Sequence, residues 1–163
     1  MKTFMTAALI AALGSVGAAA QAATADAGAG AKIIAPLQIA KKTDLYFGTI
    51  APSLTDDDSV VVGADGSRTC GPALTCLSAD HTAALFAVTG EADAVYTVSL
   101  PDSIAISNGA GAEMKVSNFA SSKDSGTLAS GTDSFTVGGT LAVAALQAAG
   151  RYTGTFTVAV EYQ

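Results

Sequence analysis

The sequence is short of the residues that most enzyme sites need. Its 163 residues include no tryptophan, one histidine and two cysteines, and only 13% of them are charged. A metal centre built on histidine and cysteine needs three or four such side chains close together, so this count leaves almost no room for one. We expect no cofactor, no metal and no enzymatic activity.

Basic residues are scarce as well. Eight Lys and Arg stand against fourteen Asp and Glu, which gives a formal net charge of −6. An acidic chain without a Lys/Arg cluster cannot replace the counterions of a phosphate backbone, so we expect no nucleic-acid partner. What is abundant is Ala, Val, Ser, Thr and 17 glycines. These residues are typical of strands and turns rather than of helices.

The first residues have the three parts of a secretory signal peptide. Lys2 gives a positive start, residues 4–20 are uncharged and apolar, and residues 20–22 place small side chains where a signal peptidase cleaves. We predict a signal peptide over residues 1–22, cleaved at its end or after Ala25. A membrane anchor is the alternative, but the run is short and rich in Ala. The mature chain is therefore expected to be exported, without a transmembrane segment of its own.

Export determines how the two cysteines are interpreted. Cys70 and Cys76 lie close together in C-G-P-A-L-T-C, and an oxidising compartment favours a disulfide between them. The loop is short, so chain entropy predicts about 2 kcal/mol of stabilisation. A redox-active pair is the alternative, but the spacing is not C-x-x-C and only one basic neighbour, Arg68, could activate a thiol. We predict a structural disulfide.

The C-terminal residues alternate between apolar and polar almost without a break. This period of two predicts a half-buried strand with one dry face and one wet face, running to the last residue. The apolar face carries Tyr152, Gly154, Phe156, Val158, Val160 and Tyr162.

Shorter runs of the same kind precede this strand. Turn-forming Gly, Pro, Asn and Asp separate them at fairly regular spacing, which favours an all-β antiparallel sandwich. Residues 53–82 are the least regular stretch and are expected to form a surface hairpin and loop. Gly138-Gly139 suggests a bulge or bend inside a strand. The predicted strands are residues 60–62, 85–89, 95–100, 103–107, 114–119 and 135–143.

A further alternating segment opens the mature chain. It is too rich in Ala and Gly to fold alone, and Pro36 marks a break after it because proline removes a ladder hydrogen bond. One hypothesis is a disordered linker followed by a strand from about Ile33; the other is a strand that pairs outside its own domain. We divide the chain into an extension, residues 23–35, and a domain, residues 36–163. The odd positions of the extension that share one face are Ala25, Ala27, Ala29, Ala31, Ile33 and Ala35.

Several stretches resemble the bacterial family catalogued as domain of unknown function 4402. They are residues 34–50, 86–101, 137–143 and 150–162. The layout is also similar to the spore coat U type of chaperone–usher pilin. In that type an L-x-F-G strand follows an N-terminal extension and a G-x-Y-x-x-T-x-x-V strand closes the chain, and residues 45–48 and 150–158 stand in those places.

The pilin resemblance implies an immunoglobulin-like sandwich that lacks its final strand. A chaperone strand covers the open groove in the periplasm, and the extension of the next subunit replaces it in the fibre. The chain would then be a fimbrial subunit that polymerises with copies of itself, served by a periplasmic chaperone and an outer-membrane usher, and ends at the cell surface. The alternating extension would be the donor, and the chain would end inside a strand because the next strand is absent. The acceptor edge would be Tyr152, Phe156, Val158, Val160 and Tyr162.

Rival functions have less support in the sequence. A monomeric secreted or periplasmic sandwich that binds carbohydrate or an adhesion target is the alternative, although such sites usually present exposed aromatic side chains. His81 follows Asp80, and neighbours on a strand point to opposite faces, so they do not form a catalytic pair. Residues 56–58 and Asp65 offer carboxylates for calcium, but without the D-x-[DN]-x-[DN]-G spacing, and this site stays an open alternative.

Overall fold

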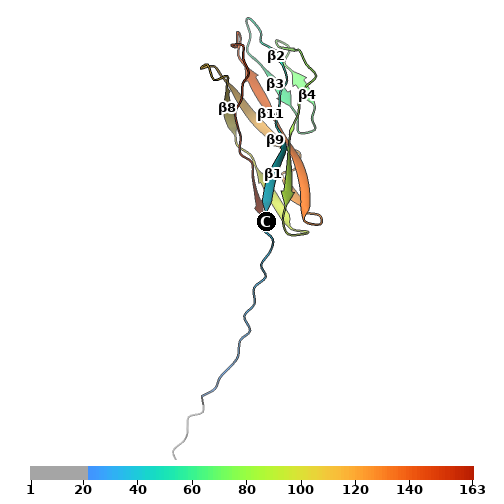
Figure 1. The fold of residues 1–163 in the computed structure, drawn as a ribbon, viewed down its shortest axis with the longest axis vertical. Helices are drawn as coiled ribbons and strands as arrows, with labels where there is room; N and C mark the ends of the chain where they lie inside the picture. The colour runs from blue at the N-terminus through green and yellow to red at the C-terminus, as the bar shows by residue number, and fades with distance from the viewer. Residues whose placement is uncertain (1–21) are drawn as a thin grey trace, which may run out of the picture. The chain divides into compact units, whose positions relative to one another are not determined.

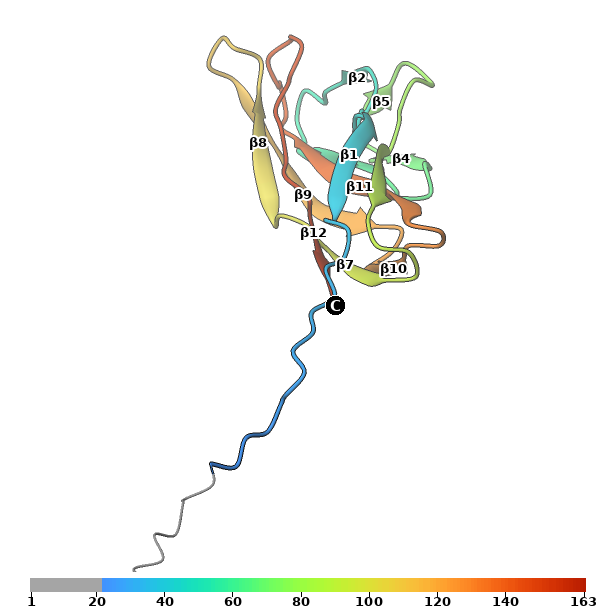
Figure 2. The same ribbon diagram turned by 60° about the horizontal axis from the view of Figure 1, so that its bottom comes forward.

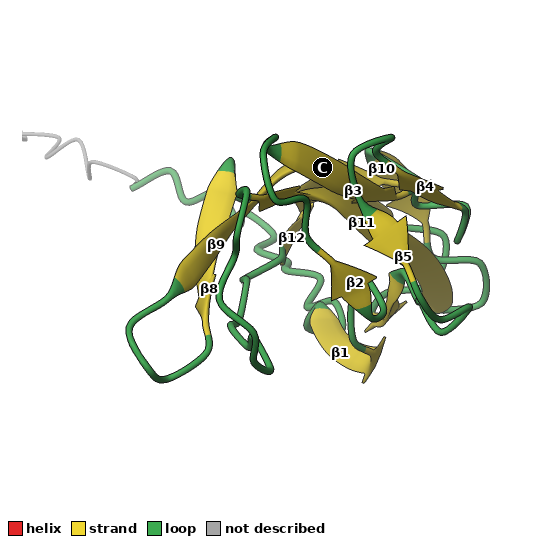
Figure 3. Cartoon of the chain, turned by 90° about the horizontal axis from the view of Figure 1, so that it is seen from above, coloured by secondary structure: helices red, strands yellow, loops and turns green. Residues whose placement is uncertain are grey.

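The computed structural model describes residues 22–163, so the predicted signal peptide lies outside the described residues except for Ala22. The described residues form strands, turns and loops without a helix, which confirms the all-β prediction (Figure 1, Figure 3). Residues 33–163 form one compact unit. The strands are β1 (Gln38–Thr43), β2 (Ile50–Ala51), β3 (Asp58–Val62), β4 (Arg68–Cys70), β5 (Thr75–Cys76), β6 (Ala84–Thr89), β7 (Val95–Ser99), β8 (Ser103–Ser107), β9 (Glu113–Ser121), β10 (Ser125–Thr127), β11 (Thr132–Val143) and β12 (Ala159–Tyr162).

The long strand β11 organises the largest sheet. It pairs with β6 along its first half, with β3 along its second half and with β9 across its middle, always antiparallel. Val137 pairs with both β6 and β9, and Thr140 with both β3 and β9. A residue has one partner on each edge, so β9 lies on one edge of β11 while β6 and β3 follow each other along the other. β1, β4 and β8 extend the sheet beyond β6, β3 and β9.

A second sheet has the order β10-β7-β12, and β2 pairs with β5 in a short ladder of its own. β7 leads into β8 through residues 100–102, so one stretch of chain passes from the second sheet to the first (Figure 2). All pairings are antiparallel, and the two sheets pack in a sandwich-like arrangement around apolar side chains.

The core consists of two clusters of buried side chains. The strands alternate as predicted: in β6, for example, Ala84, Phe86 and Val88 point inward and the residues between them do not. The disulfide-side cluster is Phe47, Val60, Val62, Leu74, Val116, Leu141 and Val143. The aromatic cluster is Ala84, Phe86, Val88, Tyr96, Leu128, Phe135 and Val137.

Residues 53–82 contain the predicted hairpin, β3 with β4, but the prediction that they lie at the surface was wrong. Val60 and Val62 on β3 are fully or almost fully buried, and Leu74, inside the loop between the cysteines, is buried as well. The irregular sequence hides this role because β3 and β4 are short and the turns between them are polar. These three side chains nevertheless form part of the disulfide-side cluster.

Gly138-Gly139 does mark a bulge, but the extra residue lies on the neighbouring strand. Gly138 pairs with Ala120 and Thr140 with Ser117, so Gly139 faces two residues of β9. One of these, Asn118, has a φ of 50°, the left-handed conformation that asparagine tolerates. A Cβ at Gly138 would lie 2.2 Å from the Val62 carbonyl oxygen, so glycine is required where β3 approaches β11 most closely.

Candidate functional site

Two strands from different sheets lie side by side with their outer edges unpaired. Among the described residues β1 pairs only with β6, and β12 pairs only with β7. β1 and β12 contact each other without forming a ladder (Figure 2). We call this place the β1–β12 seam. Each strand there still carries backbone N–H and C=O groups on an edge that can accept another strand.

The seam lies over a row of half-buried apolar side chains. Leu37 and Ile39 come from the β1 side, and all of the row packs against the aromatic cluster. Phe156 stacks on Phe119 with ring centroids 4.8 Å apart and meets Phe86 edge-on at 6.2 Å. Unlike the fully buried core residues, these side chains keep part of their surface in solvent, so a further strand would bury more apolar area. The β12 side of this row of half-buried side chains consists of Phe156, Val158, Val160 and Tyr162.

The apolar side chains of the predicted C-terminal strand point inward as expected, but fewer of its residues pair with a neighbouring strand than expected. Burial alternates over residues 156–163 as predicted, although Gly154, expected on the apolar face, is exposed, and only Ala159–Tyr162 pairs along β7. The register explains why. Ser99 lies opposite Ala159 and Ser107 opposite Thr153, so the stretch 100–106 has more residues than the segment 154–158 that faces it. Pro101 sits in the longer stretch and has no N–H to donate, which leaves 154–158 without a continuous ladder.

The predicted acceptor residues divide into two groups. Phe156, Val158, Val160 and Tyr162 line the seam. Tyr152 does not reach the aromatic cluster: its hydroxyl donates to the Ala148 carbonyl at 2.7 Å and accepts from the Gln147 amide at 2.9 Å. Tyr152 therefore orders the loop before the strand instead of lining the seam.

The predicted donor residues lie in a segment without a strand. Ala25, Ala27, Ala29 and Ala31 are exposed, and β1 begins only at Gln38, after Pro36. Ile33 is 94% exposed, the highest value of any large apolar side chain among the described residues. Ala35 is exposed too, but its backbone is held by its own domain.

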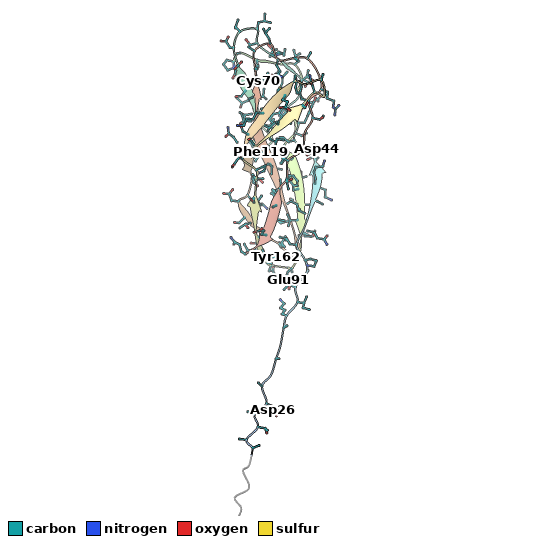
Figure 4. All side chains as sticks on the ribbon, turned by 90° about the vertical axis from the view of Figure 1, so that its left-hand side faces the viewer. Asp26, Asp44, Cys70, Glu91, Phe119 and Tyr162 are labelled. Atoms are coloured by element: carbon teal, nitrogen blue, oxygen red, sulfur yellow. A yellow bond between two sulfur atoms is a disulfide. The ribbon has the colours of Figure 1, made fainter. Side chains whose placement is uncertain are left out.

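Three residues form a hydrogen-bonded clasp around that backbone. The Tyr162 hydroxyl donates to the Ala35 carbonyl at 2.8 Å and accepts from the Glu91 backbone N–H at 2.7 Å. The Ala35 N–H in turn donates to the Glu91 carboxylate at 3.2 Å. Tyr162 and Glu91 lie together at one end of the domain, away from Cys70 (Figure 4). We call this arrangement the Tyr162 clasp.

Sequence reasoning missed the clasp. The alternation predicts Tyr162 on the acceptor edge, and Glu91 lies 71 positions away from it in the sequence. The one local sign is Gly90, because a Cβ there would lie 2.2 Å from the Tyr162 hydroxyl oxygen. A turn containing glycine gave no reason to expect this partner.

The edge of the large sheet at β4 is covalently tied. Cys70 and Cys76 form a disulfide, as predicted, with 6.4 Å between their Cα atoms, and it ties β4 to β5. The Arg68 guanidinium on β4 donates to the carbonyls of Phe47 and Ser78. Together these contacts hold β4 against the segments on both sides of it.

A buried tyrosine outside the seam, Tyr96, has a strongly raised pKa. Burial raises the pKa of Tyr96 to about 12, and its hydrogen bond to the Asp133 carboxylate, 3.0 Å long, acts in the same direction. Burial also acts to raise the pKa of Asp133, but hydrogen bonds from Lys123, the Ser134 N–H and Tyr96 outweigh it and hold that pKa below its usual value. The group supports the join between β7 and β11 and has no reactive partner.

The remaining candidate residues serve local structure. The two ring nitrogens of His81 lie 2.7 Å from the Ala79 carbonyl oxygen and 3.1 Å from that of Gly66. Asp57 accepts from the Ala145 N–H and Asp58 from the Ala73 N–H, so their carboxylates cap different loops. Within residues 22–163 no three or more His, Cys, Asp or Glu side chains gather as metal ligands would.

Comparisons with known proteins add one finding. A family model described as "Domain of unknown function (DUF4402)" matches residues 37–162, which span β1 to the end of β12. Comparisons with curated proteins and with solved structures found no match. Within the described part of the chain, no helix has the length and apolar character needed to span a membrane.

Proposed function

The chain belongs to the DUF4402 family, a domain of unknown function, and we propose that it is a fimbrial-type structural subunit. In this proposal it polymerises head to tail by donating its N-terminal segment to the β1–β12 seam of a second copy. Its work is to hold neighbouring copies together rather than to catalyse a reaction. The export predicted from the sequence would bring it through the periplasm to the cell surface.

The observation that carries the proposal is the seam itself. Two outer strand edges, one from each sheet, lie together above side chains that are only half-buried. Extended peptides bind such places by β-augmentation, in which backbone hydrogen bonds provide affinity and alternate side chains enter pockets. An edge of this kind left open would otherwise favour aggregation.

The donor segment suits this role. Residues 22–32 are exposed and form no strand, and their odd positions carry small apolar side chains as far as the larger Ile33. Alanine buries little area, so affinity would come mainly from the backbone ladder, with Ile33 as the largest side-chain anchor. Because donor and acceptor are different surfaces, the contact is heterologous and propagates as a filament.

The resemblance to spore coat U pilins adds the assembly route to the proposal. A periplasmic chaperone would cover the seam before assembly, and an outer-membrane usher would exchange the chaperone strand for the extension of the next copy. The alternative, a monomeric secreted or periplasmic module that binds carbohydrate or an adhesion target, would leave the extension without a role.

Deletion of residues 23–33 tests the proposal. We expect the exported protein to remain folded but to lose both filaments in electron micrographs and the SDS-resistant ladder on gels of unboiled samples. Normal filaments from the deletion variant would contradict strand donation. A sharp monomer from the unmodified protein would favour the monomeric module.

A matched pair of variants tests the facing of the donor. Ala27→Asp with Ala29→Asp places two charges on the side chains predicted to enter the seam, and should abolish the ladder. Gly28→Asp with Gly30→Asp places the same charges one residue away, on the outward face, and should largely preserve it. Equal effects of the two pairs would mean that the extension does not bind as a strand with one buried face.

A further inference from the structure

The Tyr162 clasp acts on the residue where the extension joins the domain. Two of its three hydrogen bonds occupy the N–H and the C=O of Ala35. Tyr162 is also the last residue of β12, so the clasp lies at one end of the seam. The position raises a question that strand donation poses in any single chain: why the extension does not fill the seam of its own domain.

Self-insertion has a large advantage in concentration. A segment attached by a short linker is present at an effective concentration of the order of millimolar, well above that of other copies in a dilute compartment. The alternating extension and the seam belong to the same chain and are joined through only a few residues. Polymerisation therefore needs something that disfavours the closed form.

The extension can reach the seam of its own domain only by turning back where it joins β1. Only Pro36 and Leu37 separate Ala35 from the start of β1, and Gln38 is held by its pairing with Thr89 of β6. The reversal must therefore take place at residues 35–37. It requires the planar peptide groups on both sides of Ala35 to rotate, which changes the directions of the Ala35 N–H and C=O.

The clasp fixes the direction of both of these groups. The Ala35 carbonyl accepts from Tyr162 and the Ala35 N–H donates to the Glu91 carboxylate, so the chain cannot turn back at Ala35 without breaking the clasp. Gly90 leaves the space in which the tyrosine hydroxyl sits, since a Cβ there would collide with it. The arrangement thus depends on side chains from two separate elements acting on one backbone unit.

We propose that Tyr162, assisted by Glu91, is a positioning residue that prevents the extension from inserting into its own seam and so directs strand donation to a second copy. This inference rests on the proposed function, because it presumes that the extension fits a seam. The substitution that isolates it is Tyr162→Phe, which removes the hydroxyl and keeps the ring over the aromatic cluster.

The test uses a labelled synthetic peptide of residues 23–34 as a probe for open seams, added to dilute monomer. Four proteins are compared: the unmodified chain, Tyr162→Phe, Tyr162→Phe lacking residues 23–33, and the unmodified chain lacking residues 23–33. Tyr46→Phe is the matched control, because it removes an exposed tyrosine hydroxyl from a residue outside β1 and β12 that does not pack against the aromatic cluster. Fluorescence anisotropy gives the peptide concentration at half-saturation.

We expect Tyr162→Phe to raise that concentration at least tenfold, because its own extension competes for the seam. Removing the extension from Tyr162→Phe should restore the value of the unmodified chain lacking the extension. Glu91→Ala, which removes one of the three hydrogen bonds, should give a smaller rise, and Tyr46→Phe none.

Two outcomes would overturn the inference while strand donation stands. One is unchanged peptide binding by Tyr162→Phe. The other is weak binding that persists after the extension is removed, which would mean that the hydroxyl shapes the seam itself. If no protein binds the peptide, including the unmodified chain lacking its extension, the proposed function fails and the clasp proposal fails with it.

Discussion

Two outer strands of the large sheet, β4 and β1, have free edges that are protected in different ways. At β4 the edge strand has three residues, a disulfide ties it to β5, and Arg68 donates to carbonyls on either side. At β1 the edge strand has six residues and contains a bulge at Lys42. An exposed ion pair between Lys41 and Asp44 lies at its end.

The difference follows how proteins manage strand edges. Short strands and covalent ties remove an edge from use, whereas lysines and bulges only discourage unwanted pairing. The β4 edge is therefore closed, whereas the β1 edge is protected only weakly. The predictions that follow test this contrast, beginning with the largest expected effect.

A charge in the open seam should have the largest effect. Val160→Asp places a carboxylate among the half-buried side chains of the seam, and we expect affinity for the peptide of residues 23–34 to fall at least a hundredfold. Thr69→Asp places the same charge on an exposed position of the closed edge and should leave peptide binding within about twofold. Circular dichroism would establish that both variants are folded. Comparable losses from both substitutions would show that the two edges do not differ.

Removing the disulfide should weaken the closed edge without opening it. Replacing both cysteines by serine should lower the free energy of unfolding by about 2 kcal/mol, the value expected for a short loop. Urea denaturation of the oxidised protein and the double variant measures this. Peptide binding at the seam should not change, because β1 and β12 pair with neither β4 nor β5. A gain of peptide-binding sites would contradict the assignment of β4 as a closed edge.

Alkaline pH should destabilise the domain through Tyr96. Its pKa is raised to about 12 in the folded chain, so the stabilising contribution is complete below pH 10 and is lost as pH rises from 10 towards 12. Between pH 9 and pH 11 the unmodified protein should lose about 1 kcal/mol more than Tyr96→Phe, as measured by urea midpoints. Asp133 should act at the other end of the pH scale. Because its pKa is lowered in the folded chain, its contribution to folding stability is present above pH 4 and disappears as pH falls below that range. Parallel alkaline curves for the two proteins would rule out this role for Tyr96.

The ion pair on the open edge should matter least. Lys41 and Asp44 are both largely exposed, so Lys41→Ala should change the free energy of unfolding by less than about 0.5 kcal/mol. Thermal denaturation at low and high salt would measure this small effect. A loss above 1 kcal/mol would show that the pair helps to hold β1 in place.

The strand pattern could be predicted from the sequence because burial on one side of a sheet produces a period of two. The inward residues of β6 and the facing of residues 156–162 follow directly from that alternation. The extent of pairing could not be predicted. It depends on the register between 100–106 and 154–158, and a register is set by two distant segments at once.

The candidate site was foreseen on one side only. Phe156, Val158 and Val160 were expected at an acceptor edge, whereas the opposite wall formed by Leu37 and Ile39 was not. Tyr152 was placed with them by its position in the alternation, but its hydroxyl is held by the loop before the strand. Alternation specifies a face of a strand and does not specify which neighbour that face meets.

The sequence alone determined the all-β class, the disulfide between two nearby cysteines and the alternating character of both terminal segments. These properties are local, since they depend on residue types at short spacing. Only the tertiary structure decided that β1 and β12 lie side by side with open edges, and that Tyr162 and Glu91 meet at Ala35. Those contacts join residues more than fifty positions apart, and no spacing in the sequence encodes them because they arise from how the two sheets pack.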